Sequence, residues 1–174
     1  MGQAVVREAS AREVGENGAA LVDLLSDAVD DGAGLGFLPP LDRAEGEAWV
    51  AQVAADVARG TRVALLATLD GALAGTAQLD LCTRPNGLHR AECQKVMVHR
   101  RFRRRGVGAA LMRAVDAAAI ARGRTTLHLD TFADQGARRL YEKAGWVHAG
   151  DVPAFARTAT GELGATSIYY RLLG

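Results

Sequence analysis

Residues 95–108 read Lys-Val-Met-Val-His-Arg-Arg-Phe-Arg-Arg-Arg-Gly-Val-Gly, and an Ala- and Leu-rich stretch follows to residue 122. The apolar residues 96–98 are typical of the end of a buried strand, and residues 107–122 have the apolar spacing of a helix. The first backbone N–H groups of a helix lack internal partners and carry the positive end of its dipole. Glycines let a ligand approach the backbone closely. With five arginines between residues 100 and 105, we predict that this turn binds a polyphosphate.

The turn does not match two common phosphate loops. A Walker loop needs Gly-Lys followed by Ser or Thr, which is absent from the chain. Gly106-Val107-Gly108 also lacks the third glycine of a dinucleotide fingerprint, because Leu111 occupies that place. Arg103-x-x-Gly106-x-Gly108 instead resembles the Q/R-x-x-G-x-G/A pyrophosphate loop of the GCN5-related N-acetyltransferase (GNAT) superfamily, which binds acetyl-CoA. Taken alone, the match also fits an arginine-rich solvated turn.

Composition indicates one globular domain, over residues 4–174, in a chain of 174 residues. The net charge of +1 argues against general nucleic-acid binding, so the basic run is a local feature. No apolar run approaches the roughly 18 residues of a membrane span. The first residues lack a signal-peptide pattern, and we expect a soluble, cytoplasmic protein. Cys82 and Cys93 form no metal or redox motif, and the histidines have no metal-ligand spacing.

The order of expected elements predicts an α+β domain with a mixed, mostly antiparallel sheet of about six or seven strands and about four flanking helices. The long strand before the arginines, the helix after them and the next strand form a βαβ unit, so these two strands should be parallel. The resemblance implies the same architecture, the acyl-CoA N-acyltransferase fold. The expected strands are 4–8, 62–69, 72–82, 88–98, 125–131, 146–151 and 165–172. The expected helices are 11–31, 41–59, with a capping box of Asp42 and Glu45, 107–122 and 134–144.

A second segment extends the resemblance. Asp134-x-x-Ala137-x-x-Leu140-Tyr141-Glu142-Lys143-x-Gly145-Trp146 is similar to the N-x-x-A-x-x-L-Y-E-K-x-G-F segment of the family. Asp134 stands where the family has Asn, which can donate a hydrogen bond to the cofactor, whereas an ionised Asp only accepts. Asp134 therefore either contacts coenzyme A or caps the following helix, and the residue type favours the cap.

The resemblance implies which residues hold acetyl-CoA. Main-chain groups at Val96, Met97 and Val98 would bind the pantetheine arm, and one N–H there would stabilise the thioester oxygen. Arg100 or Arg101 would meet the 3′-phosphate. The implied diphosphate site and its flanks comprise Arg103, Arg104, Arg105, Gly106, Val107, Gly108 and Ala109.

Three side chains are candidates for the chemistry. The resemblance places Tyr141 near the thioester sulfur, where a neutral phenol can protonate the departing thiolate; a core-packing role would also suit a helical tyrosine. Glu92, which strand periodicity sets on one face with Gln94, Val96 and Val98, is a candidate base for the incoming ammonium, or its binding group. Asp130, at the end of the next strand, is the rival base or anchor, unless it only satisfies loop backbone groups.

The tail from Gly150 to Leu173 is similar to that of tabtoxin-resistance-type acetyltransferases, which implies a small amine-bearing acceptor. Phe155, Arg157 and Tyr169 are candidates for the wall of its pocket. The sequence thus predicts an acetyl-CoA-dependent N-acetyltransferase that acts on a primary amine without a metal, and family members often form homodimers. Two alternatives stay open: a non-catalytic acyl-CoA sensor with the same fold, and an N-acetyltransferase that acts on a protein amine.

Overall fold

One mixed sheet organises the protein. The computed structural model describes residues 2–133 and 137–174, and within them seven strands lie in the order β1-β2-β3-β4-β5-β7-β6. β4 and β5 are parallel, while every other pair of neighbours is antiparallel. The predicted α+β fold with one parallel βαβ unit is confirmed. The strands are β1 (Val5–Ala9), β2 (Arg62–Leu69), β3 (Ala72–Leu81), β4 (Arg90–Val98), β5 (Thr126–Phe132), β6 (Val147–Arg157) and β7 (Leu163–Leu172).

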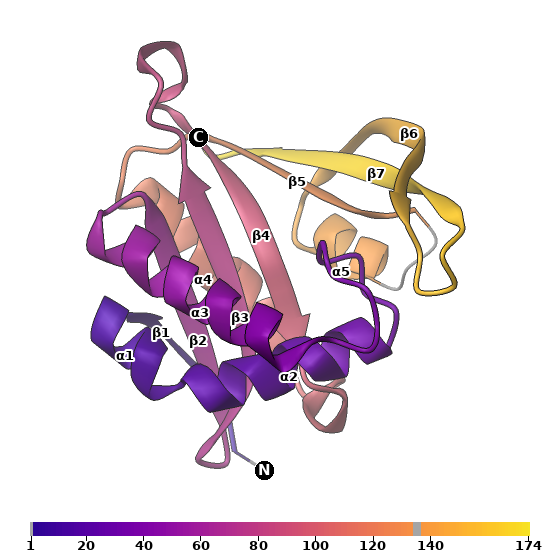
Figure 1. Ribbon diagram of the computed structural model, residues 1–174. Coiled ribbons are helices and arrows are strands. Elements are labelled where there is room, and N and C mark those ends of the chain that lie inside the picture. The colour runs from indigo at the N-terminus through magenta and orange to yellow at the C-terminus, as the bar shows by residue number, and fades with distance from the viewer. Residues whose placement is uncertain (1, 134–136) are drawn as a thin grey trace.

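Helices cover both faces of this sheet (Figure 1). The first three lie on one face and the last two on the other, so the sheet is the middle layer of three. Among the described residues, no helix is long and apolar enough to cross a membrane. The helices are α1 (Ala11–Glu16), α2 (Gly18–Asp30), α3 (Arg43–Ala58), α4 (Val107–Ile120) and α5 (Ala137–Lys143).

The central strands are buried on both faces, as the packing of their alternate side chains shows. Along β2, Val63, Leu65 and Ala67 pack toward α4, whereas Ala64 and Leu66 pack against α1 and α3. Because successive side chains of a strand point to opposite faces, a strand covered on both sides is apolar throughout. The two apolar cores, one on each face of the sheet, fix the strand register, since a slip of one residue would move each side chain to the opposite face.

A bulge at Lys95 interrupts the alternation of β4. Lys95 has a φ of 50°, and the register with β3 shifts between Thr76 and Gln78. Ala91 and Cys93 face α4 before the bulge, and after it the residues that face α4 are 96 and 98. The expectation that Glu92, Gln94, Val96 and Val98 share one face is therefore wrong, because the extra residue exchanges the two faces.

Two expectations for the N-terminal helices need correction. The helix expected over 11–31 is two helices, because Asn17 ends α1 and starts α2, and its side-chain amide donates to the carbonyl of Glu13 at 2.8 Å. Asn competes with helical hydrogen bonds in this way, and Gly15 and Gly18 weaken the helix around it. Asp42 caps α3 through the N–H of Ala44 alone, whereas the reciprocal capping box forms at Ser10 and Glu13.

The C-terminal hairpin is longer than the sequence indicated. β6 runs on to Arg157, through Pro153, where a loop was expected. Pro153 is tolerated because β6 is the edge strand, where a missing N–H leaves no neighbour unpaired. Its register with β7 shifts between Val152 and Ala156, so the strand is bulged level with the end of β5, across the intervening β7.

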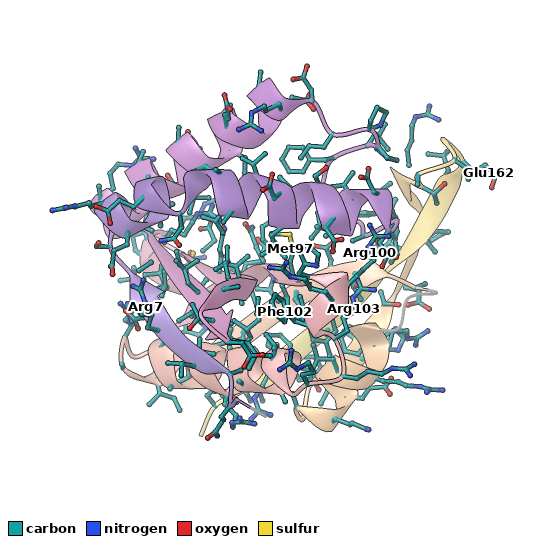
Figure 2. All side chains as sticks on the ribbon, turned by 90° about the horizontal axis from the view of Figure 1, so that it is seen from below. Arg7, Met97, Arg100, Phe102, Arg103 and Glu162 are labelled. Carbon is teal, nitrogen blue, oxygen red and sulfur yellow. The ribbon has the colours of Figure 1, made fainter. Side chains whose placement is uncertain are left out.

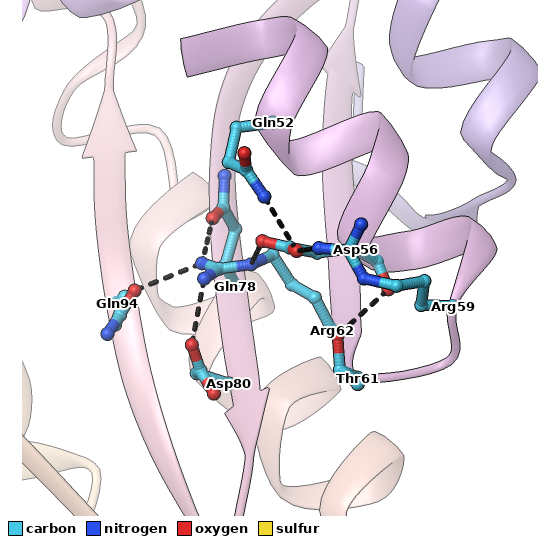
Figure 3. Close-up of polar contacts among 8 residues, drawn as sticks. All are labelled: Gln52, Asp56, Arg59, Thr61, Arg62, Gln78, Asp80 and Gln94. Carbon is cyan, nitrogen blue, oxygen red and sulfur yellow. Dashed lines mark hydrogen bonds and ion pairs between the residues drawn. The ribbon is translucent and has the colours of Figure 1, made fainter.

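A buried arginine ties the middle of the sheet to α3 (Figure 3). The Arg62 guanidinium donates to Asp56 of α3, to Gln78 and Asp80 of β3, and to Gln94 of β4, at 2.8–3.2 Å. Its side chain is only 13% exposed. A guanidinium has five N–H donors and no acceptor, and these residues accept from four of the five. The network holds β4 in place one residue before the bulge.

We expect the Arg62→Met variant to lose about 3 kcal/mol in its free energy of unfolding, because it leaves the side-chain oxygens of Gln78 and Gln94 without their donor and removes one of the donors to Asp56. Arg12→Met is the matched control, since the Arg12 side chain is 86% exposed and, among the described residues, pairs only with Glu16. Exposed pairs contribute little, so this variant should unfold like the parent. Urea denaturation measures both, and equal stability of the two variants would contradict the role given to the network.

Candidate functional site

The site is an opening in the sheet between β4 and β5. These strands pair only from Arg90 to Glu92 on β4 and from Thr126 to His128 on β5, and they diverge beyond that point. A cavity of about 160 Å³, here called the inner cavity, occupies the gap. It is lined from the α4 face by Cys93, Val96 and Tyr141 and from the α2 face by Leu35 and its neighbours, so it passes through the sheet. Two ligands can therefore meet there from opposite faces.

Tyr141 reaches this cavity from α5. Its ring is buried and tilts against the rings of Trp146 and Tyr169, with centroids 6.2 and 5.9 Å away. Its hydroxyl has no hydrogen-bond partner among the described residues. Burial is the main cause that raises the pKa of Tyr141 above that of a free phenol. The phenol therefore keeps its proton at neutral pH, as a donor requires, while core packing fixes its ring.

The structure brings both candidate carboxylates to the same cavity. Glu92 lines it from β4 and Asp130 from β5, together with Tyr141. Cys93 also lines it, but burial raises the pKa of this thiol strongly. A thiol held in its neutral form is a poor nucleophile, which leaves the carboxylates and the phenol as the groups suited to moving protons here.

Sequence analysis missed Lys95. At the bulge Lys95 lines the inner cavity, and its Nζ donates to the carbonyl of Leu35 at 2.6 Å and lies 5.7 Å from the centroid of the Phe37 ring. Burial and, second, the Arg62 guanidinium lower the pKa of Lys95. The lysine thereby ties the loop that follows α2 to the opening in the sheet. The available signal in the sequence was a lysine inside an expected buried strand, between Gln94 and the apolar residues 96–98.

Gln94 was also missed as a member of the cavity wall. Its Oε1 accepts from Arg62 at 3.0 Å. Because a guanidinium can only donate, the oxygen must face Arg62, and the amide NH₂ is turned the other way (Figure 3). Gln94 thus brings a fixed hydrogen-bond donor to the inner cavity, beside two carboxylates.

The turn before α4 has the geometry of an anion site. Gly106 is the N-cap of α4 in the left-handed conformation, with φ of 81°, and no side chain caps the helix there. A Cβ on Gly106 would meet nothing within 4 Å, so this side of the turn is open. The preceding Arg104 is also left-handed, with φ of 58°. The N–H groups of Val107, Gly108 and Ala109 are those that a helix leaves unpaired.

Gly108 has a packing role in addition to the one expected. A Cβ at this position would lie 3.2 Å from Leu140 of α5. The glycine therefore allows α4 and α5 to pack closely. This packing sets the position of the helix that holds Tyr141.

Carboxylates already engage three of the five arginines in this turn. Arg100 pairs with Asp27 and Arg103 with Asp31, both near the C-terminal end of α2 (Figure 2), while Arg105 pairs with Asp70. Arg101 stacks over the Phe102 ring, with 4.6 Å from its guanidinium carbon to the ring centroid. The Arg103–Asp31 and Arg105–Asp70 pairs are partly exposed and therefore weak, so a phosphate can replace these two carboxylates at little cost, whereas Asp27 is only 10% exposed. Arg104 has no ion-pair partner among the described residues.

The main chain after the bulge offers further hydrogen-bonding groups. Met97 and Val98 pair with Thr76 and Gly75 of β3, but on the β5 side no strand among the described residues pairs with Val96, Met97 or Val98. Unpaired main-chain groups at a strand edge can bind an extended ligand as an added strand. Asp134, the remaining candidate for this ligand, lies outside the described residues.

A second cavity, of about 330 Å³ and here called the outer cavity, adjoins the inner one, since Gly34 and Asp130 line both. Phe155 and Arg157 of β6 belong to its wall, as the sequence suggested. Tyr169 does not: it is fully buried, and its hydroxyl accepts from Arg138 at 3.0 Å. Phe37 and Phe132, which the sequence analysis did not single out, line this cavity as well.

Comparison with known proteins agrees with this geometry. The chain resembles an N-acetyltransferase from Staphylococcus aureus Mu50 with a TM-score of 0.81 and 20% identity, over 99% of each chain. A GNAT-family acetyltransferase from Streptococcus pneumoniae gives 0.76 and 24%, over 99% of this chain and 100% of that one. A phosphinothricin acetyltransferase from Sinorhizobium meliloti, solved in complex with acetyl-CoA, gives 0.78 and 19%, over 99% and 89%. The family model of the acetyltransferase (GNAT) family matches residues 30–146, and the chain therefore belongs to this family of acetyltransferases.

Proposed function

We propose that this acetyltransferase moves the acetyl group of acetyl-CoA directly to a primary amine of a small-molecule acceptor. The observation on which the proposal rests is the inner cavity, which passes through the sheet and brings Tyr141 together with Glu92 and Asp130. Membership of the GNAT family supports the cofactor, as does the acetyl-CoA in the S. meliloti neighbour. The small volumes of the two adjoining cavities favour a small acceptor over a folded protein.

The residues around α4 fit a diphosphate. The N–H groups of Val107, Gly108 and Ala109 would bind its oxygens at the positive end of the α4 dipole. Arg103, Arg104 and Arg105 would add charge, with Arg103 exchanging Asp31 for phosphate. Main-chain groups at 96–98 on the β5 side would hold the pantetheine arm and direct the thioester into the inner cavity, with Arg103 releasing the Val98 carbonyl where the arm needs it.

Transfer forms a bond between the amine nitrogen and the carbonyl carbon and breaks the carbon–sulfur bond. Glu92 or Asp130 accepts the proton that the ammonium must lose before it can attack. A main-chain N–H near Val98 donates to the carbonyl oxygen as negative charge develops on it. Tyr141 gives its proton to the departing thiolate and regains one from the amine nitrogen, which loses a second proton once it is bonded to the acetyl carbon. Charge and protons then balance without a covalent intermediate on the protein.

Incubation with acetyl-CoA and a panel of amines tests the function directly. We expect release of free coenzyme A thiol in amounts equal to the acetylated amine, which mass spectrometry identifies. Tight acetyl-CoA binding without transfer to any amine would contradict the proposal and would favour a sensing role.

The Tyr141→Phe variant should lower kcat roughly 100-fold, because the thiolate loses its proton donor. The ring still packs against Trp146 and Tyr169, so the melting temperature and the Kd for acetyl-CoA should stay close to those of the parent. Steady-state kinetics and calorimetry measure the three quantities. Unchanged turnover would show that the phenol is only part of the core.

The Gly106→Leu variant should weaken acetyl-CoA binding by about tenfold or more, because its side chain fills the open side of the turn. Gly60→Leu is the control: Gly60 is also left-handed, with φ of 71°, and faces open space, but it follows α3 far from the site. Both variants should lose about 1–2 kcal/mol of stability through backbone strain. Calorimetry that finds equal affinity for the two variants would exclude the diphosphate site at α4.

A further inference from the structure

The outer cavity has an unusual wall. The chain has four phenylalanines, and three of them, Phe37, Phe132 and Phe155, line this one cavity. They come from three separate segments: the loop after α2, the end of β5 and the bulged part of β6. The fourth, Phe102, is buried under the arginine-rich turn. Aromatic side chains have thus gathered at the cavity that leads to the candidate carboxylates.

Phe155 lines the outer cavity although more than half of its surface stays exposed there. It is 55% exposed on an edge strand, a position where a large apolar side chain adds little to the core. Around it β6 is bulged, and the preceding Ala154 is left-handed, with φ of 52°. A bulge redirects the side chains of a strand. This backbone distortion brings Phe155 to the wall of the outer cavity without a packing benefit of its own.

The opposite wall is held firmly. A Cβ on Gly34 would lie 2.6 Å from the Phe132 ring, so the loop lies directly on this ring. Lys95 anchors the same loop through the carbonyl of Leu35 and lies over the Phe37 ring. Phe37 and Phe132 are therefore fixed before a ligand arrives, and the cavity is preformed.

Charge fixes the orientation of a ligand in this space. Asp130 lines both cavities, at their junction, and is the carboxylate that an ammonium entering from the outer cavity meets first. Aromatic faces attract cations as well as other rings. Arg157 also lines the outer cavity, but its guanidinium donates to the carbonyl of Gly161 at 2.8 Å. The Asp130 carboxylate and the three rings together complement a cationic head with a flat apolar body.

From these features we infer that the acceptor is a primary amine joined to an aromatic ring by a short linker. The ring occupies the outer cavity among the three phenylalanines, and the amine extends past Asp130 to the thioester. The inference rests on the proposed function and adds the acceptor class to it. Phe155 is then a residue that determines specificity, without a part in the chemistry.

The test compares 2-phenylethylamine with n-butylamine, two primary amines of equal charge, only one of which has a ring. We expect the parent protein to prefer 2-phenylethylamine by about tenfold or more in kcat/KM, because the ring gains contacts with three aromatic side chains. Equal values for the two amines would overturn the inference while leaving the acetyltransferase function intact. Failure to acetylate any amine would instead overturn the proposed function, and the acceptor class with it.

The variants Phe155→Ala and Val152→Ala sharpen this test. Both residues are exposed apolar positions on β6, but only Phe155 lines the outer cavity. Phe155→Ala should lower kcat/KM for 2-phenylethylamine about tenfold and leave n-butylamine unaffected, whereas Val152→Ala should change neither. The melting temperature and the acetyl-CoA affinity of both should match those of the parent. A loss of the same size with both amines, or with both variants, would contradict the role given to Phe155.

Discussion

The parting of β4 from β5 is the constraint on which the rest of the site depends. Two parallel strands that share three residue pairs and then diverge leave a gap in the middle of the domain. Closing it would restore main-chain hydrogen bonds that a sheet normally makes, so something must hold it open. The side chains of the βαβ unit and α5 do this on one face, and the loop tied down by Lys95 does it on the other. Because the gap passes through the sheet, a thioester and an amine can approach one another from opposite faces.

The surrounding fold compensates for this opening. Arg62 joins β2, β3, β4 and α3 through four acceptors, beside the place where β4 loses its other neighbour. The bulge at Lys95 then exchanges the two faces of the strand, so Glu92 and Gln94 lie on the α2 face while residues 96 and 98 pack toward α4. Ion pairs from α2 neutralise part of the arginine-rich turn. The network, the bulge and the ion pairs each position one wall of the site.

Local signals in the sequence predicted much of the fold around the site. Asp70-Gly71 between two apolar runs indicated the β2–β3 hairpin, and the helix after the arginine-rich turn implied the parallel pair β4 and β5. Lys95 could not be recognised as a bulge, because a positive φ at a lysine depends on tertiary contacts rather than on residue type. For the same reason the prediction that Glu92 and Val98 share one face of the strand was wrong. Phe37 and Phe132 were missed as cavity residues, because they and Phe155 come from segments that are far apart in the sequence. Gly34 and Gly36 beside Phe37 were the available hint of a close approach.

A crystal structure of the protein with coenzyme A tests the central claim most directly. The account predicts diphosphate oxygens within hydrogen-bond distance of the amides at the start of α4, the pantetheine arm along residues 96–98, and the sulfur in the gap between β4 and β5 beside Tyr141. A cofactor held elsewhere on the surface, or a gap closed by side chains with the sulfur outside it, would contradict the account.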